Sequence, residues 1–570
     1  MRHFVRLLTH VLLFLVLAFA GNWLWMRHAR AWDLGQRSPV LSDDSAQYAL
    51  AARELATHGR FATTYALPVE LVRHPAPPWP LALVQPGLVI GEALLYRLTA
   101  PPAYLIKGRR FDPVRPDQRE WVTLIIPFVC FIVISIALAL GCMRLLWRFA
   151  PDLRLEWRAA LGTLIGAAFL LDPEAQHFAT GGFTELPFTL GLVGATVALA
   201  LGLGARRPLV FGLLLGATGA FRGTMLWLAP VYALGAACSA DPGRRWRSFA
   251  RTLAGFVLPL VPWWLYKWQA FGTSSWDLSA WSVWDGVQGR SWFTLFNASE
   301  VPPLPHGFEA ASLLLQKLAR NLPGVLLTLG TGLRPLQIGA IAIWLSMARS
   351  APRTLRVAAG TVLSLTLVAV ITAAISVPQL RYMFPTRMLL EAAGTLAVVA
   401  LIHRAATVKQ SSRRMIAALF AVLLLAWGGW QTRLGLIEAA ETSHERGMPG
   451  TLTLLRIASM MNREIPHDEP VMSNLGPSLA WEARRPVIHL AVSPDELTAC
   501  RRHTDFHHVL LVFRDAAHAW PEWASVVAHP MDALRRVEWG VRHVRQYDSE
   551  DGFVVIWLEL GPLGPELAGR

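Results

Sequence analysis

The sequence predicts a polytopic α-helical membrane protein that carries a small α/β domain at its C-terminus. Hydrophobic residues make up 54% of the chain and charged residues only 16%, with a mean hydropathy of +0.38, which is more apolar than a soluble protein of this length requires. Apolar stretches of roughly 20 residues recur up to residue 432. From residue 441 onward, the apolar runs shorten to the length of strands.

About eleven segments are long and apolar enough to be read as transmembrane helices. The first segment carries Arg2 and Arg6, and Ala18-Phe19-Ala20 resembles a cleavage site, so the segment is either a cleavable secretory signal or an uncleaved anchor that runs to about Trp25. We expect the anchor, because many more spans follow it. The expected spans are 8–26, 121–147, 157–171, 183–204, 208–221, 223–238, 249–266, 323–347, 355–377, 382–403 and 414–432.

The positive charges predict the orientation of these spans. If 208–221 and 223–238 are two short helices rather than one long one, five basic clusters fall on the same side as the N-terminus, as cytoplasmic loops require. This distribution argues against nucleic-acid binding, although the formal net charge is +14. The four cysteines have no spacing typical of a disulfide framework or a zinc site. The outer face then carries two long loops, 27–120 and 267–322, and every candidate reactive residue.

The first outer loop contains two adjacent carboxylates, Asp43 and Asp44. Ser42 or either carboxylate can cap a helix that ends at Gly59 and whose apolar period is typical of a helix lying on the membrane surface. Residues 72–98 indicate a second surface helix or a re-entrant segment. One carboxylate suffices as a cap, so the second could accept a proton or hold a cation at the positive end of the helix.

These motifs together resemble a known superfamily. The acidic pair, Tyr48, "RHPAPPWPL", "FTELPFTL" and "LRYMFP" occur in the order found in the GT-C glycosyltransferases that use polyprenyl-phosphate sugars, which include protein O-mannosyltransferases and lipid A aminoarabinose transferases. The resemblance extends to about residue 432. Many relatives have Asp-Glu where this chain has Asp43 and Asp44, and the alignment to Tyr48 favours Asp44 as the catalytic residue.

The resemblance implies an inverting transferase for a hexose or a pentose. Asp44, or Asp43 in its place, would deprotonate or orient the acceptor hydroxyl. Arg222 and Arg381 would bind the donor phosphate, because guanidinium groups match phosphate oxygens. The alternative for both arginines is that they extend to lipid headgroups.

Further residues have weaker signals. Glu185 is expected either to cap a helix or to position the acceptor or a metal ion. Tyr48, His74 and Tyr382 are expected to contact substrate, and Tyr382 could instead simply pack. The sequence requires no cofactor. A divalent cation is an alternative, held by Asp43, Asp172 and His177 together with His74, although no spacing demands one.

Residues 1–432 would form the catalytic membrane domain, and 441–562 an α/β domain outside the membrane. In this second domain we expect strands within 469–476, 485–491, 507–513 and 552–560, and helices near 446–464 and 493–503. Its role would be acceptor recognition, capping of the site, or stabilisation alone.

The expected setting is the cytoplasmic (inner) membrane, with the N-terminus in the cytoplasm and the C-terminal domain outside. The expected partners are a polyprenyl-phosphate-linked sugar, a lipid, glycan or protein acceptor, and membrane lipid, in the biosynthesis of a cell-envelope glycan. One alternative is a secondary transporter, which should show repeated halves. Another is a scaffold, or a polysaccharide ligase or polymerase with a lipid-pyrophosphate donor.

Overall fold

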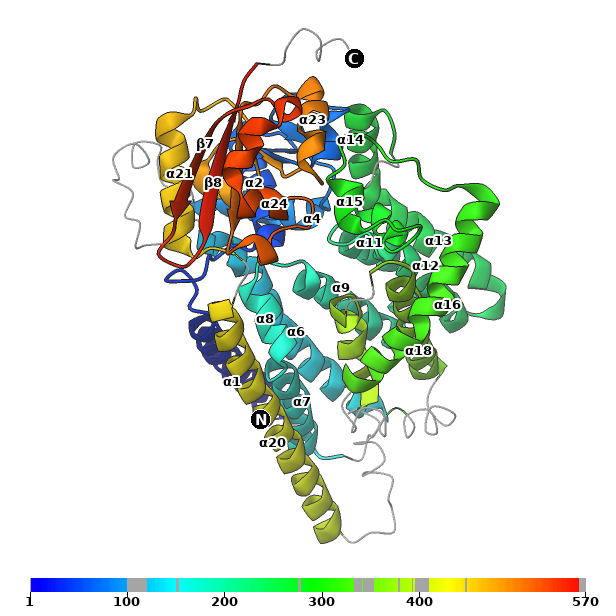
Figure 1. Cartoon of the computed structure of the whole chain (residues 1–570). Coiled ribbons are helices and arrows are strands. Elements are labelled where there is room, and N and C mark those ends of the chain that lie inside the picture. The colour runs from blue at the N-terminus through cyan, green and yellow to red at the C-terminus, as the bar shows by residue number, and fades with distance from the viewer. Residues whose placement is uncertain are drawn as a thin grey trace.

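The computed structural model describes residues 2–99, 120–149, 153–274, 278–332, 341, 353–377, 380–391, 393–394, 410–445 and 448–562. Figure 1 shows a bundle of helices with a mixed α/β part at one end. The helices of the bundle are α1 (Arg2–Ala31), α6 (Glu120–Phe149), α7 (Leu155–Leu170), α8 (Pro173–Thr180), α9 (Glu185–Ala200), α10 (Leu203–Arg206), α11 (Pro208–Gly219), α12 (Met225–Ser239), α13 (Arg245–Val257), α14 (Val261–Phe271), α16 (Gly307–Gly332), α18 (Arg353–Ile375) and α20 (Gln410–Glu445).

Among the described residues, three helical segments are long and apolar enough to cross a membrane, namely Leu8–Ala31, Glu120–Trp147 and Arg353–Ile375. The helices α9, α11 and α12 are shorter and apolar. Residues 208–221 and 223–238 therefore contain two separate helices, as the charge argument required. The total of about eleven spans stays a prediction, because parts of 323–347 and 382–403 lie outside the described residues.

Two expected boundaries were wrong. Helix α16 begins at Gly307, inside the segment expected to be the second outer loop, and its buried Lys317 donates a hydrogen bond to the carbonyl of Val283. The expected span 249–266 is divided between α13 and α14, which are joined by a short 3₁₀ helix at Leu258–Leu260.

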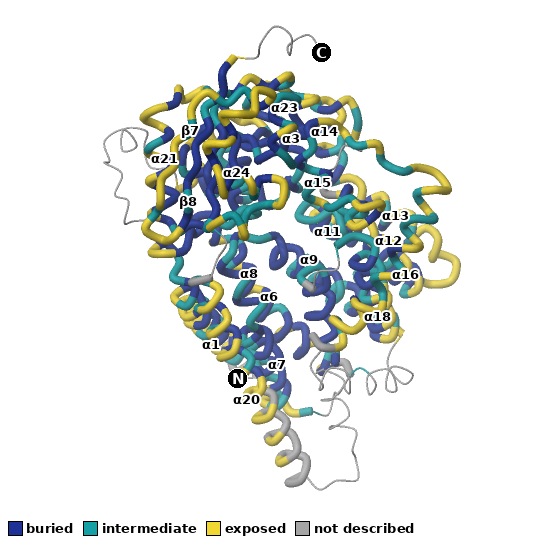
Figure 2. The backbone as a smooth tube through the Cα atoms, in the orientation of Figure 1, coloured by how far each residue is buried: buried dark blue, intermediate teal, exposed yellow. Residues whose placement is uncertain are grey.

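Helices α1 and α20 pack together at the edge of the bundle. Figure 2 shows that both expose much of their surface, whereas α6 and α9 lie largely inside. Leu12, Phe19 and Trp430 are among the large apolar side chains that α1 and α20 expose. Such surfaces are expected of helices that face lipid.

The α/β part contains a six-stranded sheet with the strand order β2-β5-β4-β6-β8-β7. The first four strands in this order are parallel, and β8 and β7 are antiparallel to their neighbours. The strands are β2 (Tyr65–Ala66), β4 (Val471–Ser473), β5 (Val487–His489), β6 (His508–Phe513), β7 (Val541–Asp548) and β8 (Val554–Leu560), and the main helices are α21 (Thr451–Glu464), α22 (Gly476–Ala483) and α23 (Leu497–His503). All four expected strands and both expected helices are present in this region.

One strand of this sheet comes from the loop between α1 and α6. Tyr65 pairs with Val487, and Ala66 pairs with Ile488, in parallel register. The same loop supplies α3 (Pro68–Leu71) and a short antiparallel ladder between β1 (Ala62–Thr63) and β3 (Trp79–Pro80). The sheet is therefore built from two segments that are distant in the sequence.

Helix α2 (Asp43–His58) is packed on protein and does not lie alone on a membrane surface as expected. It contacts α4 (Pro86–Thr99) and α22, so α2 and α4 lie against the C-terminal elements in Figure 1. Small apolar residues such as Ala46, Ala49 and Leu50 are fully buried in a core shared with α21 and α22. The helix ends at Gly59 as predicted, where φ is 69° and the amide donates to the carbonyl of Leu55.

Candidate active site

The first turn of α2 contains the acidic pair. The carboxylate of Asp44 accepts a hydrogen bond from Arg381, with a distance of 3.0 Å between Oδ2 and Nη1. Arg381 lies in a short 3₁₀ helix, Leu380–Met383, beyond the end of α18. Both side chains remain partly exposed, at 45% for Asp44 and 37% for Arg381. The structure thus brings together two predicted site residues that are 337 positions apart.

A second acid and arginine pair lies close by and is more deeply buried. Oε1 of Glu185 is 2.9 Å from Nη1 of Arg222, and their side chains are only 4% and 12% exposed. Glu185 begins α9, where a carboxylate interacts favourably with the positive end of the helix. Arg222 lies in the turn between α11 and α12. The two ion pairs leave the cluster with a balanced formal charge.

Tyr382 connects the two pairs. The centre of its ring is 5.1 Å from the guanidinium carbon of Arg222 and 5.3 Å from that of Arg381. Both contacts are within the range of a cation–π interaction. The ring therefore attracts both positive groups to one place.

Tyr48 completes the cluster, four residues after Asp44 on α2. Its hydroxyl group forms a hydrogen bond with Thr184, the residue before Glu185. Burial, the largest effect, raises the pKa of Tyr48 well above its usual value, so the phenol is neutral at physiological pH. A neutral hydroxyl can hydrogen-bond a sugar or a phosphate oxygen.

The second carboxylate of the pair faces the α/β part. Oδ1 of Asp43 accepts a hydrogen bond of 2.9 Å from the hydroxyl of Ser478 in α22. Burial raises the pKa of Asp43 to about 7; the hydrogen bond from Ser478 opposes this rise, and the charge of Asp44 adds to it. Asp43 and Asp44 therefore have different environments, although they are neighbours in the sequence.

A close approach holds the start of α2 against the bundle. Gly182 has a φ of +68°, and a Cβ atom added to it would lie 2.8 Å from the Cβ of Ser45. A glycine is needed here both for the left-handed backbone and for the space. The loop that leads into Glu185 therefore touches the turn that carries Asp44.

The structure places the remaining predicted residues elsewhere. Nε2 of His74 lies 2.9 Å from the carbonyl oxygen of Ala270, and its ring contacts Phe271. The ring of His177 packs beside Trp32 and Phe183. The role of His74 in substrate binding stays a prediction.

Asp172 has a structural role at the start of α8. Its Oδ1 accepts a hydrogen bond from the amide of Ala175, and its Oδ2 lies 3.7 Å from Nη2 of Arg387. Arg387 also binds Glu174 at 2.6 Å. Among the described residues, no three His, Cys, Asp or Glu side chains form a group that could hold a metal ion. A divalent cation at Asp43, Asp172 and His177 stays an expectation from the sequence.

Sequence reasoning missed Arg387, Glu174 and Ser478. The signal for Arg387 was a charged residue inside the expected span 382–403, since such residues are usually paired or functional. Ser478 gave no signal, because a serine close to the end of a strand is common on any protein surface.

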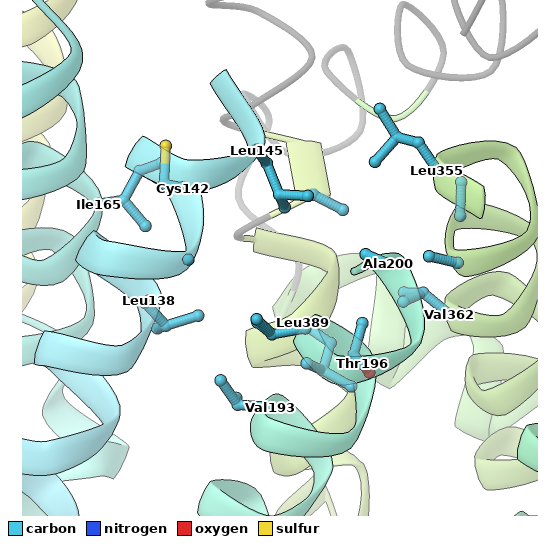
Figure 3. A pocket seen from close by; sticks show the side chains of 15 residues that line it. Leu138, Cys142, Leu145, Ile165, Val193, Thr196, Ala200, Leu355, Val362 and Leu389 are labelled. Carbon is cyan, nitrogen blue, oxygen red and sulfur yellow. The ribbon is translucent and has the colours of Figure 1, made fainter. Parts of the chain in front are cut away.

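A separate apolar cavity lies within the bundle, with a volume of about 70 Å³. Figure 3 shows apolar side chains of α6, α9 and α18 around it, together with Leu389. Val193 of α9 lines it and is eight residues beyond Glu185, which places it about 12 Å along the helix from the charged cluster. The cavity therefore lies deeper in the bundle than the site.

These features define a helical membrane fold with an α/β part and a paired acid and arginine site. No protein-family model matches the sequence, and no curated protein matches it either. Among solved structures, the chain is similar to ArnT from Cupriavidus metallidurans bound to undecaprenyl phosphate, with 14% identity, a TM-score of 0.51, and coverage of 98% of this chain and 99% of that chain. It is also similar to the apo state of that protein, with 15% identity, a TM-score of 0.49 and full coverage of both chains.

The likeness to the ArnT structure with bound lipid extends over nearly the whole of both chains. The chain therefore has the ArnT fold. The GT-C resemblance seen in the sequence motifs is confirmed at the level of the fold.

Proposed function

We propose that the protein is an inverting glycosyltransferase of the GT-C type, which moves a sugar from a polyprenyl-phosphate donor to a lipid, glycan or protein acceptor on the outer face of the cytoplasmic membrane. The observation that carries the proposal is the contact between Asp44 and Arg381 in a chain with the ArnT fold. This contact brings the proposed base, Asp44, and the proposed phosphate-binding group, Arg381, to one site. The likeness to a structure that contains undecaprenyl phosphate supports the choice of donor.

The proposed reaction needs only these groups. Asp44 accepts the proton of the acceptor hydroxyl, and the acceptor oxygen forms a bond to the anomeric carbon. At the same time the bond between that carbon and the phosphate oxygen breaks, and the polyprenyl phosphate departs with the electron pair. Arg381 stabilises the extra negative charge on the departing phosphate. Displacement from the opposite face inverts the anomeric carbon.

The second pair has a supporting role in this proposal. The side chain of Arg222 is 12% exposed and that of Arg381 is 37% exposed, so Arg381 is the stronger candidate for direct contact with phosphate. Tyr382 would hold Arg381 in place, and Arg222 would add positive potential.

The proposal is tested by native mass spectrometry of the purified protein in nanodiscs with a panel of polyprenyl-phosphate sugars, one lipid-pyrophosphate sugar and no other donor. We expect one phosphate-linked sugar to bind wild type and Arg433→Ala, a control at an exposed arginine on α20. Binding should be lost in Arg381→Ala. Asp44→Asn should bind the donor and fail to transfer the sugar.

Three results would contradict the proposal. Binding of the lipid-pyrophosphate sugar alone would favour a ligase or polymerase. Binding of no donor would favour a transporter. Equal binding by wild type and Arg381→Ala would remove Arg381 from the phosphate site.

A further inference from the structure

Ser478 lies where the sheet faces the acidic helix. Strand β4 is central, between β5 and β6, and α22 begins three residues after it ends. Ser478 is the third residue of α22 and is only 3% exposed. Its hydroxyl donates to Asp43 across the contact between α22 and α2. A buried polar contact favours one arrangement of the two parts that it joins, because both groups lose their hydrogen bonds to water on burial and any other arrangement would leave them unpaired.

The first turn of α2 has no side-chain cap on its free amides. The residue before the helix, Ser42, forms no side-chain bond to the free amides of that turn. Such unsatisfied helix ends tend to fray. The hydrogen bond from Ser478 to Asp43 attaches this turn to the sheet, and the contact between Gly182 and Ser45 attaches it to the bundle.

Asp43 and Asp44 point in different directions because successive residues of a helix are about 100° apart. Asp43 faces α22, and Asp44 faces Arg381. A rotation of the first turn that breaks one contact therefore moves the other carboxylate as well.

Further contacts keep α22 itself in place. The indole nitrogen of Trp481 donates to Glu120 at the start of α6, at 3.0 Å, and the guanidinium of Arg53 lies 4.7 Å from the centre of the Trp481 ring. Glu120 is itself buried. These contacts hold α22 against the bundle and against α2. Because α22 is held in place, it can fix the position of the first turn of α2.

We propose that Ser478 is a positioning residue of the active site, which holds the first turn of α2 through Asp43 and thereby sets the place of the Asp44 carboxylate beside Arg381. The proposal rests on the proposed function for its catalytic consequence. The α/β part would then be needed for the chemistry as well as for stability.

The test compares Ser478→Ala with Ser478→Thr, which keeps the hydroxyl, and with Ser459→Ala, a control at an exposed serine of α21. The first readout is amide hydrogen exchange in residues 43–48, which needs no activity. We expect faster exchange there in Ser478→Ala only, with the exchange of β4 and β6 unchanged. The second readout is sugar transfer. In Ser478→Ala, kcat should fall at least about tenfold, because small displacements of a reacting group are costly, while KM for the donor stays within about twofold.

Unchanged exchange in residues 43–48 would overturn the proposal, even if sugar transfer is demonstrated. An equal rise in β4 and β6 would also overturn it, because the effect would then be a general folding defect. If wild type transfers no sugar from any donor, the proposed function fails, and the exchange data alone decide whether Ser478 anchors the turn.

Discussion

Replacing Asp44 with asparagine should make the protein bind polyprenyl phosphate more tightly, although sugar transfer is lost. In the structure, Asp44 occupies one of the donor groups of Arg381, at 3.0 Å. A phosphate that binds Arg381 must compete with this carboxylate and must also approach its negative charge. The asparagine side chain is neutral, so the competition would end.

The size of the effect follows from the exposure of the pair. Both side chains are more than one-third exposed, and ion pairs of this kind contribute about 0.2–1 kcal/mol. Since about 1.4 kcal/mol corresponds to a tenfold change in affinity, the Kd for the lipid should fall by roughly 1.4- to 5-fold. The effect should shrink at high ionic strength, because salt screens exposed charges.

The assay is a titration of the protein in nanodiscs with sugar-free polyprenyl phosphate, at low and at high salt. Asp43→Asn is the matched control, because Asp43 contacts Ser478 and not Arg381. Its Kd should stay close to that of wild type. Weaker or equal binding by Asp44→Asn would refute the idea that the carboxylate and the phosphate compete for one guanidinium.

Two further predictions concern stability. Gly182→Ala and Gly59→Ala impose similar backbone strain, at φ of +68° and +69°, and strain of this kind costs about 1–3 kcal/mol. Only the Cβ atom added at Gly182 meets a neighbour, Ser45. Gly182→Ala should therefore lower the thermal midpoint further than Gly59→Ala and should also reduce sugar transfer. Equal losses would show that the contact with Ser45 is unimportant. The pKa of Asp43 is raised from 3.8 to about 7, so the folded protein holds the proton of this carboxyl more tightly than the unfolded chain does. The resulting stabilisation of the folded state is fully present below about pH 4 and is lost as the pH rises through about 7. Asp43→Asn should therefore raise the thermal midpoint relative to wild type more at pH 8 than at pH 5, and a constant difference between the two proteins would contradict the shifted pKa.

The helical bundle and the acidic helix could be predicted because their signals are local. The stop at Gly59 and the apolar period of the segment before it defined α2. The basic clusters predict that Asp44 and Arg381 lie on one side of the membrane, but their pairing connects residues 337 positions apart and is not visible in a local pattern. The resemblance to a family is what assigns the separate motifs to one site in the sequence analysis.

The failures have physical causes. Residues 307–322 looked like a loop because Glu309, Lys317 and Arg320 interrupt the apolar run, yet they belong to one amphipathic helix. Strand β7 was missed because most of its side chains are exposed and polar, and β2 because it has only two residues. The hydrogen bond of Ser478 depends on a contact between two distant parts of the chain, which no pattern within either part encodes.

The two-residue strand β2 has a consequence for the assembly of the protein. It covers one edge of β5, and it is synthesised some 400 positions before the strand that it covers. The C-terminal segment must therefore pair with a strand that was synthesised earlier, in the loop between α1 and α6. A fragment consisting of 441–562 alone would leave the edge of β5 unpaired, and exposed strand edges promote association between molecules. When produced on its own, such a fragment is expected to self-associate, and a peptide that supplies the missing strand should suppress this.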